Sequence, residues 1–190
     1  KIEKEIATIQ RRLSRPGVEK FSKRWHYYQK IVRKKHTKIS RIRQNFLHEV
    51  SEDICKNHAI VCMENLKVKN MSKSSSGTIE EPGKMVAQKS GLNRSILRQG
   101  WGMFRQFCEY KTKRYGGHLE LVNPKNTSRR CSKCGHISKD NRKNQSDFQC
   151  QNCGYEENAD KNAANNILAL GLESLGLSTL EAPTIATPVA

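Results

Sequence analysis

A chain of 190 residues can bury one ordinary hydrophobic core and a small additional module, and it is short for two full domains. Its 35 Lys and Arg outnumber 18 Asp and Glu, and the formal net charge of +17 favours a polyanionic partner. No apolar run approaches the roughly 20 residues that a membrane-spanning helix needs, and no signal-peptide pattern opens the chain. Nucleic acid is therefore a better candidate than a membrane, and we expect a cytoplasmic protein.

Residues 1–58 are predicted to form a hairpin of two helices. The first apolar stripe consists of Ile2, Ile6, Ile9 and Leu13. The tripeptide at residues 15–17, Arg-Pro-Gly, breaks this stripe, and a second one extends from Phe21 to Ile54. Because the chain opens directly in a helical pattern and without an initiator Met, we expect it to begin within a longer protein.

Positive charge is concentrated in this hairpin. Residues 1–50 contain 15 Lys and Arg against 4 Glu, a net charge of +11. A solvated helix face would also carry many lysines, but the clustering favours a track for the phosphates of a nucleic acid. The candidate nucleic-acid-binding residues are Arg33, Lys34, Lys35, Lys38, Arg41 and Arg43.

A strand is predicted at residues 59–64, where a short apolar run is typical of a strand covered on both faces of a mostly parallel sheet. Glu64 stands at its C-terminal end, the edge at which ligands and catalytic groups collect in open α/β sheets. Residues 70–91 are rich in Ser, Gly, Lys and Pro, which predicts a mobile loop. A helical stripe from Leu97 to Tyr115 and a strand at residues 118–122 complete the part that ends near residue 126.

Residues 127–158 are polar and have too few apolar side chains for a core of their own. Two C-x-x-C-G sequences supply the thiols of Cys131, Cys134, Cys150 and Cys153. Two intervening residues let both thiolates of a pair reach one ion, and the Gly permits a tight turn. The 15 residues between the pairs suit a zinc ribbon. Four thiolates close a tetrahedral Zn²⁺ site, so the predicted ion is structural rather than catalytic.

Redox chemistry of the C-x-x-C pairs is the main alternative, although two pairs separated by a polar insert argue against it. Seven cysteines, four of them in such pairs, suit metal binding in a reducing compartment better than disulfides. Cys55, Cys62 and Cys108 lie on apolar stripes or strands and are predicted to be core residues.

Glu64 and Asp160 are the acidic residues with the most informative contexts. Each has a simpler interpretation, since Glu64 could be a solvated strand end and Asp160 an acid favoured by the helix dipole. One carboxylate at the end of a buried strand and another at the start of the helix after a metal knuckle can, however, converge on one pocket. Converging carboxylates bind Mg²⁺ or Mn²⁺, and a pair of such ions can cleave a phosphodiester. Two carboxylates are rarely enough for two ions, so a third is expected.

The last predicted element is a helix at residues 159–172, which carries Asp160 in its first turn. Residues 173–190 have almost no charge, and we expect a disordered tail there.

Five strings together resemble the C-terminal half of the TnpB/OrfB proteins of insertion sequences, which are related to type V CRISPR effectors. Their order and spacing match from residue 1 to about residue 172. The strings are VCMENL at 61–66, GWGMF at 100–104, CSKCG at 131–135, CQNCGY at 150–155 and DKNAANNI at 160–167.

The resemblance implies an α/β fold of the RNase H-like (RuvC) nuclease type, interrupted by a four-cysteine zinc ribbon. It further implies an enzyme, also called a transposase, that cuts DNA with Mg²⁺ or Mn²⁺ under the direction of a transposon-derived guide RNA. Glu64 and Asp160 would then be its second and third catalytic carboxylates. The family's first catalytic Asp lies upstream of the basic helices, so we expect residues 1–190 alone to be nearly inactive.

Two other classes of function stay open from the sequence. The chain could be a nucleic-acid-binding zinc-ribbon fragment or regulator without catalytic activity. A protein-interaction adaptor is disfavoured, because it would not need the basic hairpin.

Overall fold

The structure is a computed structural model that describes residues 1–177, and it divides into two compact units, residues 1–50 and the residues from Ser51 onward. It mixes helices and strands, in agreement with the predicted α/β class. None of the described helices combines the length and apolar character needed to cross a bilayer.

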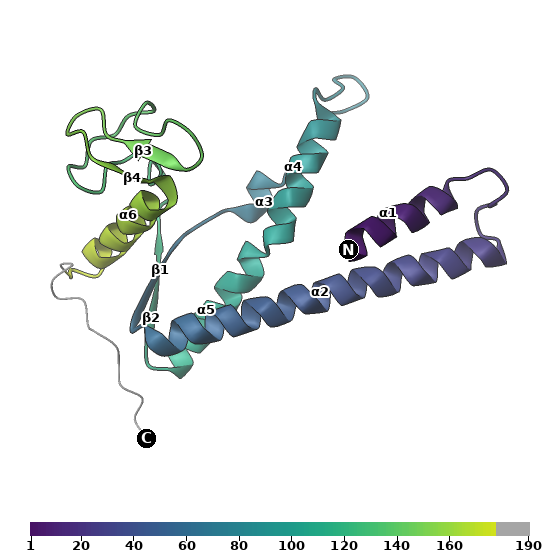
Figure 1. The fold of residues 1–190 in the computed structure, drawn as a ribbon, viewed down its shortest axis with the longest axis horizontal. Helices are drawn as coiled ribbons and strands as arrows, with labels where there is room; N and C mark the ends of the chain where they lie inside the picture. The colour runs from purple at the N-terminus through teal and green to yellow at the C-terminus, as the bar shows by residue number, and fades with distance from the viewer. Residues whose placement is uncertain (178–190) are drawn as a thin grey trace. The chain divides into compact units, whose positions relative to one another are not determined.

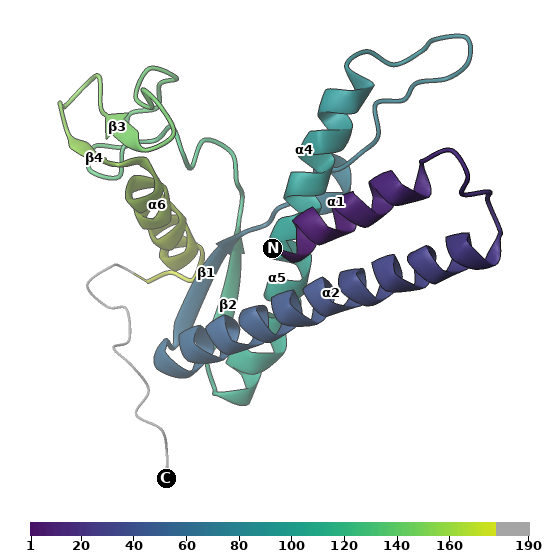
Figure 2. The same ribbon diagram turned by 45° about the vertical axis from the view of Figure 1, so that its right-hand side comes forward.

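The first unit contains α1 (Ile2–Leu13) and most of α2 (Lys23–Asn57), which lie side by side in Figure 2. Gly17 adopts φ +86° in the turn between them, as expected from the helix-breaking tripeptide. The Ser22 hydroxyl then caps α2 by accepting a hydrogen bond from the Trp25 N–H at 3.2 Å. Ile6, Val32 and Leu47 are the buried apolar residues of this unit, and Lys35 of α2 forms an ion pair with Glu5 of α1. The predicted helical hairpin is therefore present.

The second unit is built on two parallel strands, β1 (Ile60–Glu64) and β2 (His118–Val122). Glu64 is paired with Val122, so both strands end at the same edge. Helices α5 (Trp101–Arg114) and α6 (Ala159–Ser174) pack against this strand pair (Figure 1). A Cβ added at Gly171 of α6 would lie 2.3 Å from the Cys62 Sγ, so glycine permits the close approach of α6 to β1.

The segment between β1 and α5 differs from the sequence expectation in its boundaries. Residues 70–91 were expected as one loop, but α3 (Val68–Met71) overlaps its beginning and α4 (Val86–Gln99) overlaps its end. The Ser- and Gly-rich stretch favours turns, whereas residues 86–90 contain no helix breaker and extend the helix that follows. The helical stripe from Leu97 to Tyr115 is likewise divided, because Gly100 adopts φ +73° between α4 and α5. The mobility of the intervening stretch stays a prediction.

The cysteine-containing segment has a short antiparallel pair, β3 (Asp147–Gln149) and β4 (Glu156–Asn158), which leads directly into α6. Phe148 is the largest apolar side chain buried there, at 2% exposed. Helix α6 extends two residues beyond the predicted end at residue 172. Its C-terminal end is capped by a hydrogen bond from the Leu177 N–H to the Leu172 carbonyl. The part of the predicted tail from residue 178 onward lies outside the described residues.

Candidate metal centre and carboxylate site

The four predicted cysteine ligands gather into one cluster. Their sulfur atoms all lie within 4.8 Å of one another, with Cys131 and Cys153 separated by 3.8 Å and Cys134 and Cys150 by 3.5 Å. Thiolates at about 2.3 Å from a tetrahedral Zn²⁺ are separated by about 3.8 Å from one another. The cluster can hold a metal ion, and its dimensions suit zinc.

Both knuckles have the same backbone geometry, which follows from the C-x-x-C-G spacing. Cys131 accepts a hydrogen bond from Gly135 through its carbonyl and donates one to His136 through its N–H, each at 2.9 Å. Cys150 repeats the pattern with the two residues that follow its own pair, at 3.0 and 2.8 Å. The two glycines adopt φ +76° and +70°, a region that favours glycine.

The pKa values of two thiols in the cluster are shifted in opposite directions. A hydrogen bond from the backbone N–H of His136 lowers the pKa of the Cys134 thiol to about 6. Burial raises the pKa of the Cys131 thiol. Metal binding at this cluster therefore requires the release of protons, and a cation would take their place.

A set of buried asparagines connects the knuckles to their surroundings. Asn141 is fully buried, and its side-chain amide donates hydrogen bonds to the carbonyls of Arg129 (2.9 Å) and His136 (3.1 Å). Its side-chain oxygen accepts one from the N–H of Gln151 at 2.9 Å. One side chain thus joins the loop around the first knuckle to the beginning of the second.

Helix α6 is attached to the first knuckle by two further asparagines on one of its faces. Asn162 donates to the Arg130 carbonyl at 2.8 Å and accepts from the Ser132 N–H at 3.0 Å. Asn166, one turn later, donates to the carbonyls of Thr127 (2.9 Å) and Arg130 (2.7 Å). Residues 127–132 are therefore held against α6 by side-chain amides.

Glu64 lies at the carboxyl end of β1, as predicted, and is half-buried. Its carboxylate accepts a hydrogen bond from the hydroxyl of Thr127, a residue that follows β2. The carboxylate also lines a pocket of about 250 Å³ with apolar side chains that include Trp101, Phe104 and Ile167.

Asp160 lies in the first turn of α6, also as predicted. The side chain of Asn158 caps this helix by accepting hydrogen bonds from the N–H groups of Asp160 and Lys161. The Asp160 side chain is 83% exposed and lies 3.6 Å from a guanidinium nitrogen of Arg142. Because exposed ion pairs are weak, this carboxylate can exchange its partner for a cation.

The convergence of the two carboxylates on one pocket stays a prediction. The pocket beside Glu64 includes Ile167 of α6, two helical turns after Asp160, but Asp160 is not among its lining residues. Within residues 1–177, the cysteine cluster is the only group of three or more side chains placed to share an ion. The expected third carboxylate is thus not assembled among these residues.

Most of the predicted basic residues share one face of α2. Arg33, Lys34, Lys38 and Arg41 line a shallow groove together with His26 and Lys30. Lys35 is instead directed to Glu5 of α1, and Arg43 is half-buried and does not line the groove. We call residues 33, 34, 38 and 41, with residue 30, the basic face of α2.

Sequence reasoning missed the polar side chains that support the site, namely Thr127, Asn141, Asn162 and Asn166. The two α6 asparagines had a usable signal, because they are four residues apart and therefore on one helix face. Asn141 and Thr127 lie in irregular segments, where no periodicity distinguishes a buried polar residue from a solvated one.

The fold and the cluster define an α/β protein that carries a four-thiol metal-binding module. Two family models match it. The Cas12f1-like TNB domain matches residues 101–167, and the OrfB_IS605 model, described as a probable transposase, matches residues 1–75. The first region contains the four cysteines and Asp160, and the second contains Glu64 and the basic face of α2.

Named proteins with similar sequences point to the same family. InsQ of Escherichia coli (strain K12), which is named as an RNA-guided DNA endonuclease, is 49% identical over 171 residues, which cover 90% of this chain and 42% of InsQ. The CRISPR-associated endodeoxyribonuclease Cas12f1 of Sulfoacidibacillus thermotolerans is 40% identical over 83 residues, 43% of this chain and 20% of that protein. The chain belongs to the TnpB/OrfB family, as its sequence strings suggested. It spans less than half the length of these two relatives.

Solved structures agree with this assignment. A Cas12f1 complex with single guide RNA and target DNA superimposes with a TM-score of 0.55 at 26% identity, covering 87% of this chain and 40% of the other. A CRISPR-Cas12f ternary complex gives a TM-score of 0.56 at 24% identity over 87% of this chain and 31% of the other, which supports the fold alone.

Proposed function

We propose that the complete natural protein is an RNA-guided DNA endonuclease and that residues 1–190 contribute part of its RuvC-like nuclease domain with an inserted zinc ribbon. The similarity to InsQ over 90% of the chain carries this proposal. DNA and a guide RNA are the proposed partners, since the solved Cas12f1 neighbour is a complex with both kinds of nucleic acid.

Glu64 and Asp160 are the proposed metal-binding carboxylates, and their oxygen atoms suit Mg²⁺ or Mn²⁺. Such ions activate water and stabilise the leaving oxygen of a phosphodiester. Glu64 is supported by its place at the carboxyl end of β1 and by the hydrogen bond that fixes one of its oxygens. A carboxylate has about four lone-pair sites, so the hydrogen bond from Thr127 leaves other sites on Glu64 that can bind a cation. Asp160 is supported by its exposure and its weak partner.

The cysteine cluster is the proposed zinc site, with a structural role. Four sulfur ligands fill a tetrahedral shell and leave no position for a reacting water. The separations of 3.5 and 3.8 Å between sulfur atoms support this assignment. The hydrogen bonds of the buried Asn141, Asn162 and Asn166 side chains would make the position of α6 depend on a well-ordered zinc site.

The basic face of α2 is the proposed contact for the nucleic-acid backbone. Its side chains repeat along one face of a 35-residue helix and are mostly exposed. Backbone contacts of this kind carry affinity without sequence information, which base pairing with a guide RNA supplies.

The test is DNA cleavage by the complete natural protein, loaded with the RNA that copurifies with it. We expect Mg²⁺-dependent cutting of DNA complementary to that RNA. Glu64→Gln and Asp160→Asn should each lower the cleavage rate by orders of magnitude and leave RNA binding intact, because a lost ligand affects the ions but not the basic face.

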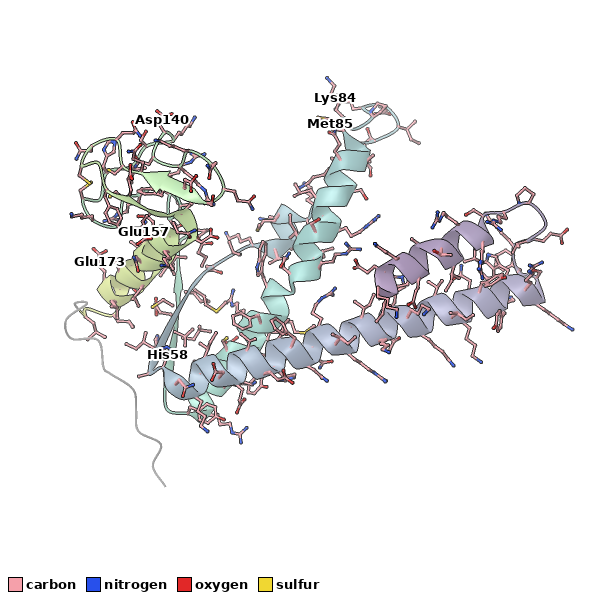
Figure 3. All side chains as sticks on the ribbon, viewed as in Figure 1. His58, Lys84, Met85, Asp140, Glu157 and Glu173 are labelled. Atoms are coloured by element: carbon pink, nitrogen blue, oxygen red, sulfur yellow. The ribbon has the colours of Figure 1, made fainter. Side chains whose placement is uncertain are left out.

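Matched controls remove one negative charge elsewhere. Glu109→Gln on α5 and Asp140→Asn in the cysteine segment (Figure 3) change exposed acids of the same types and should cut normally. Full cleavage by both Glu64→Gln and Asp160→Asn would show that the active site lies elsewhere.

A protein that binds nucleic acid without cutting it is the second candidate. The observation in its favour is that, within residues 1–177, only the four cysteines are grouped closely enough to share an ion, and neither Glu64 nor Asp160 belongs to such a group. RNA binding without DNA cleavage by the complete natural protein, in Mg²⁺ and in Mn²⁺, would support this candidate.

A further inference from the structure

Thr127 connects the ends of both parallel strands. It lies five residues after Val122, the last residue of β2, and its hydroxyl donates a hydrogen bond to the Oε1 atom of Glu64. The two residues are 63 positions apart in the sequence. Thr127 is 3% exposed, so water does not compete freely for its hydroxyl.

The Thr127 hydroxyl has two acceptors within reach and one proton to donate. The alternative acceptor is the carbonyl of Pro124, at 3.2 Å. A carboxylate is the stronger acceptor, because hydrogen bonds to ionised groups are shorter and roughly twice as strong as those between neutral groups. The Thr127 hydroxyl therefore donates its hydrogen bond to the Glu64 carboxylate rather than to the Pro124 carbonyl.

The position of Thr127 is itself fixed from α6. Its carbonyl accepts a hydrogen bond from the Asn166 side chain at 2.9 Å, and Asn166 is also 3% exposed. Asn166 lies six residues after Asp160 on the same helix. Two hydrogen bonds thus connect Glu64 through Thr127 to Asn166, which lies on the helix that carries the second proposed ligand.

We propose that Thr127 is a positioning residue that orients the Glu64 carboxylate for a divalent cation. This inference rests on the proposed function, since it assumes that Glu64 binds the ion. By donating to Oε1, Thr127 restricts rotation of the carboxylate. Residues that orient metal ligands in this way typically contribute roughly 10- to 100-fold to metal affinity or activity.

The experiment measures Mn²⁺ binding by calorimetry and Mg²⁺-dependent DNA cleavage for Thr127→Val in the complete natural protein. Valine keeps the shape of threonine and removes the hydroxyl. We expect the component of Mn²⁺ binding that depends on Glu64 to weaken roughly 10- to 100-fold and cleavage to need correspondingly more Mg²⁺. Thr127→Ser retains the hydroxyl and should recover most of both.

Thr112→Val is the matched control. Thr112 is 1% exposed, and its hydroxyl donates to the Cys108 carbonyl inside α5 at 2.8 Å. The same chemical change therefore removes a buried hydroxyl with no connection to Glu64. This variant should bind Mn²⁺ and cut DNA like the unaltered protein after any shift in melting temperature is taken into account.

The outcomes separate this inference from the proposed function. If Glu64→Gln abolishes Mn²⁺ binding and cleavage while Thr127→Val changes neither, Thr127 has no positioning role and the function stands. If Thr127→Ser fails to recover binding, or if Thr112→Val loses as much, the effect of Thr127 is structural and the inference is wrong. If Glu64→Gln itself changes nothing, both proposals fall.

Discussion

The helical hairpin and the cysteine segment show two different ways of ordering a polar chain. In the hairpin, residues 1–50, backbone hydrogen bonds within the helices satisfy the main chain, and a few buried side chains such as Ile6 and Val32 join them. In residues 127–158, strands are three residues long, and the interior holds a single large apolar side chain, Phe148, together with the thiols of Cys131 and Cys150 and the amide of Asn141. The hairpin is ordered by local periodicity, whereas the cysteine segment depends on contacts between distant residues.

This difference affects how function is distributed. The basic face of α2 repeats one kind of group, so each residue adds a small part of the affinity. In the cysteine segment every ligand and every buried amide has a separate partner, so a single substitution should have a large effect. The predictions that follow test this contrast.

Removal of the metal should have the largest effect. Cys131→Ser with Cys150→Ser should eliminate the roughly one zinc per chain that we expect and unfold residues 127–158, because structural zinc contributes about 10–16 kcal/mol in zinc-finger peptides. Metal analysis and hydrogen exchange would measure this. Cys62→Ala changes a thiol outside the cluster and should keep the zinc. If residues 127–158 kept normal hydrogen-exchange protection in the zinc-free variant, the cysteine segment would not depend on its metal for order, and the contrast with the hairpin would be wrong.

Loss of the buried side-chain amide of Asn141 should have the second-largest effect. Asn141→Leu leaves the N–H of Gln151 and the carbonyl of Arg129 without this partner, at about 1–3 kcal/mol for each unsatisfied group. The His136 carbonyl keeps its hydrogen bond from the Cys131 N–H. We expect a lower unfolding midpoint in denaturant and weaker zinc retention against a chelator. Gln145→Leu, at an exposed position in the same segment, should change neither measurably.

An ion pair at the C-terminal end of α2 should have a moderate effect. Lys111 is 3% exposed and lies 2.8 Å from Glu52, which lowers the pKa of the Glu52 carboxyl. Glu52→Gln should cost about 1 kcal/mol, because the carboxylate is 39% exposed and partly screened.

The stability from Glu52 should be present above pH 4.5, the ordinary pKa of the carboxyl, and disappear as the pH falls through the lowered value. Denaturation midpoints of the unaltered protein and of Glu52→Gln should therefore converge in acid. Glu49→Gln, an exposed acid on the same helix, should give no such convergence.

Single charges on the basic face should matter least. Lys38→Gln should weaken nucleic-acid binding slightly, while simultaneous replacement of residues 33, 34, 38 and 41 by Gln should reduce the slope of log K against log salt by up to about four. Replacement of Lys67, Lys69, Lys73 and Lys84 removes the same charge from another segment and should leave the slope nearly unchanged. Equal slopes for both quadruple variants would show that binding depends on net charge alone.

The sequence predicted the features that arise from local spacing. The C-x-x-C-G pairs determine both knuckles, the apolar periodicity gives α1 and α2, and a short apolar run gives β1 with Glu64 at its end. The position of Asp160 in the first turn of α6 follows from the residues beside it. Each of these depends on neighbours within a few residues, for which the helix and strand periods provide a rule.

The tertiary structure decided which side chains meet. It directs Lys35 to Glu5 rather than to the basic face, and it places Arg142 beside Asp160 and Thr127 beside Glu64. The last two residues are 63 positions apart and become neighbours because β1 and β2 are parallel and end at the same edge. No local pattern encodes such a pairing, since a hydroxyl in an irregular segment looks the same in sequence whether it faces water or a carboxylate.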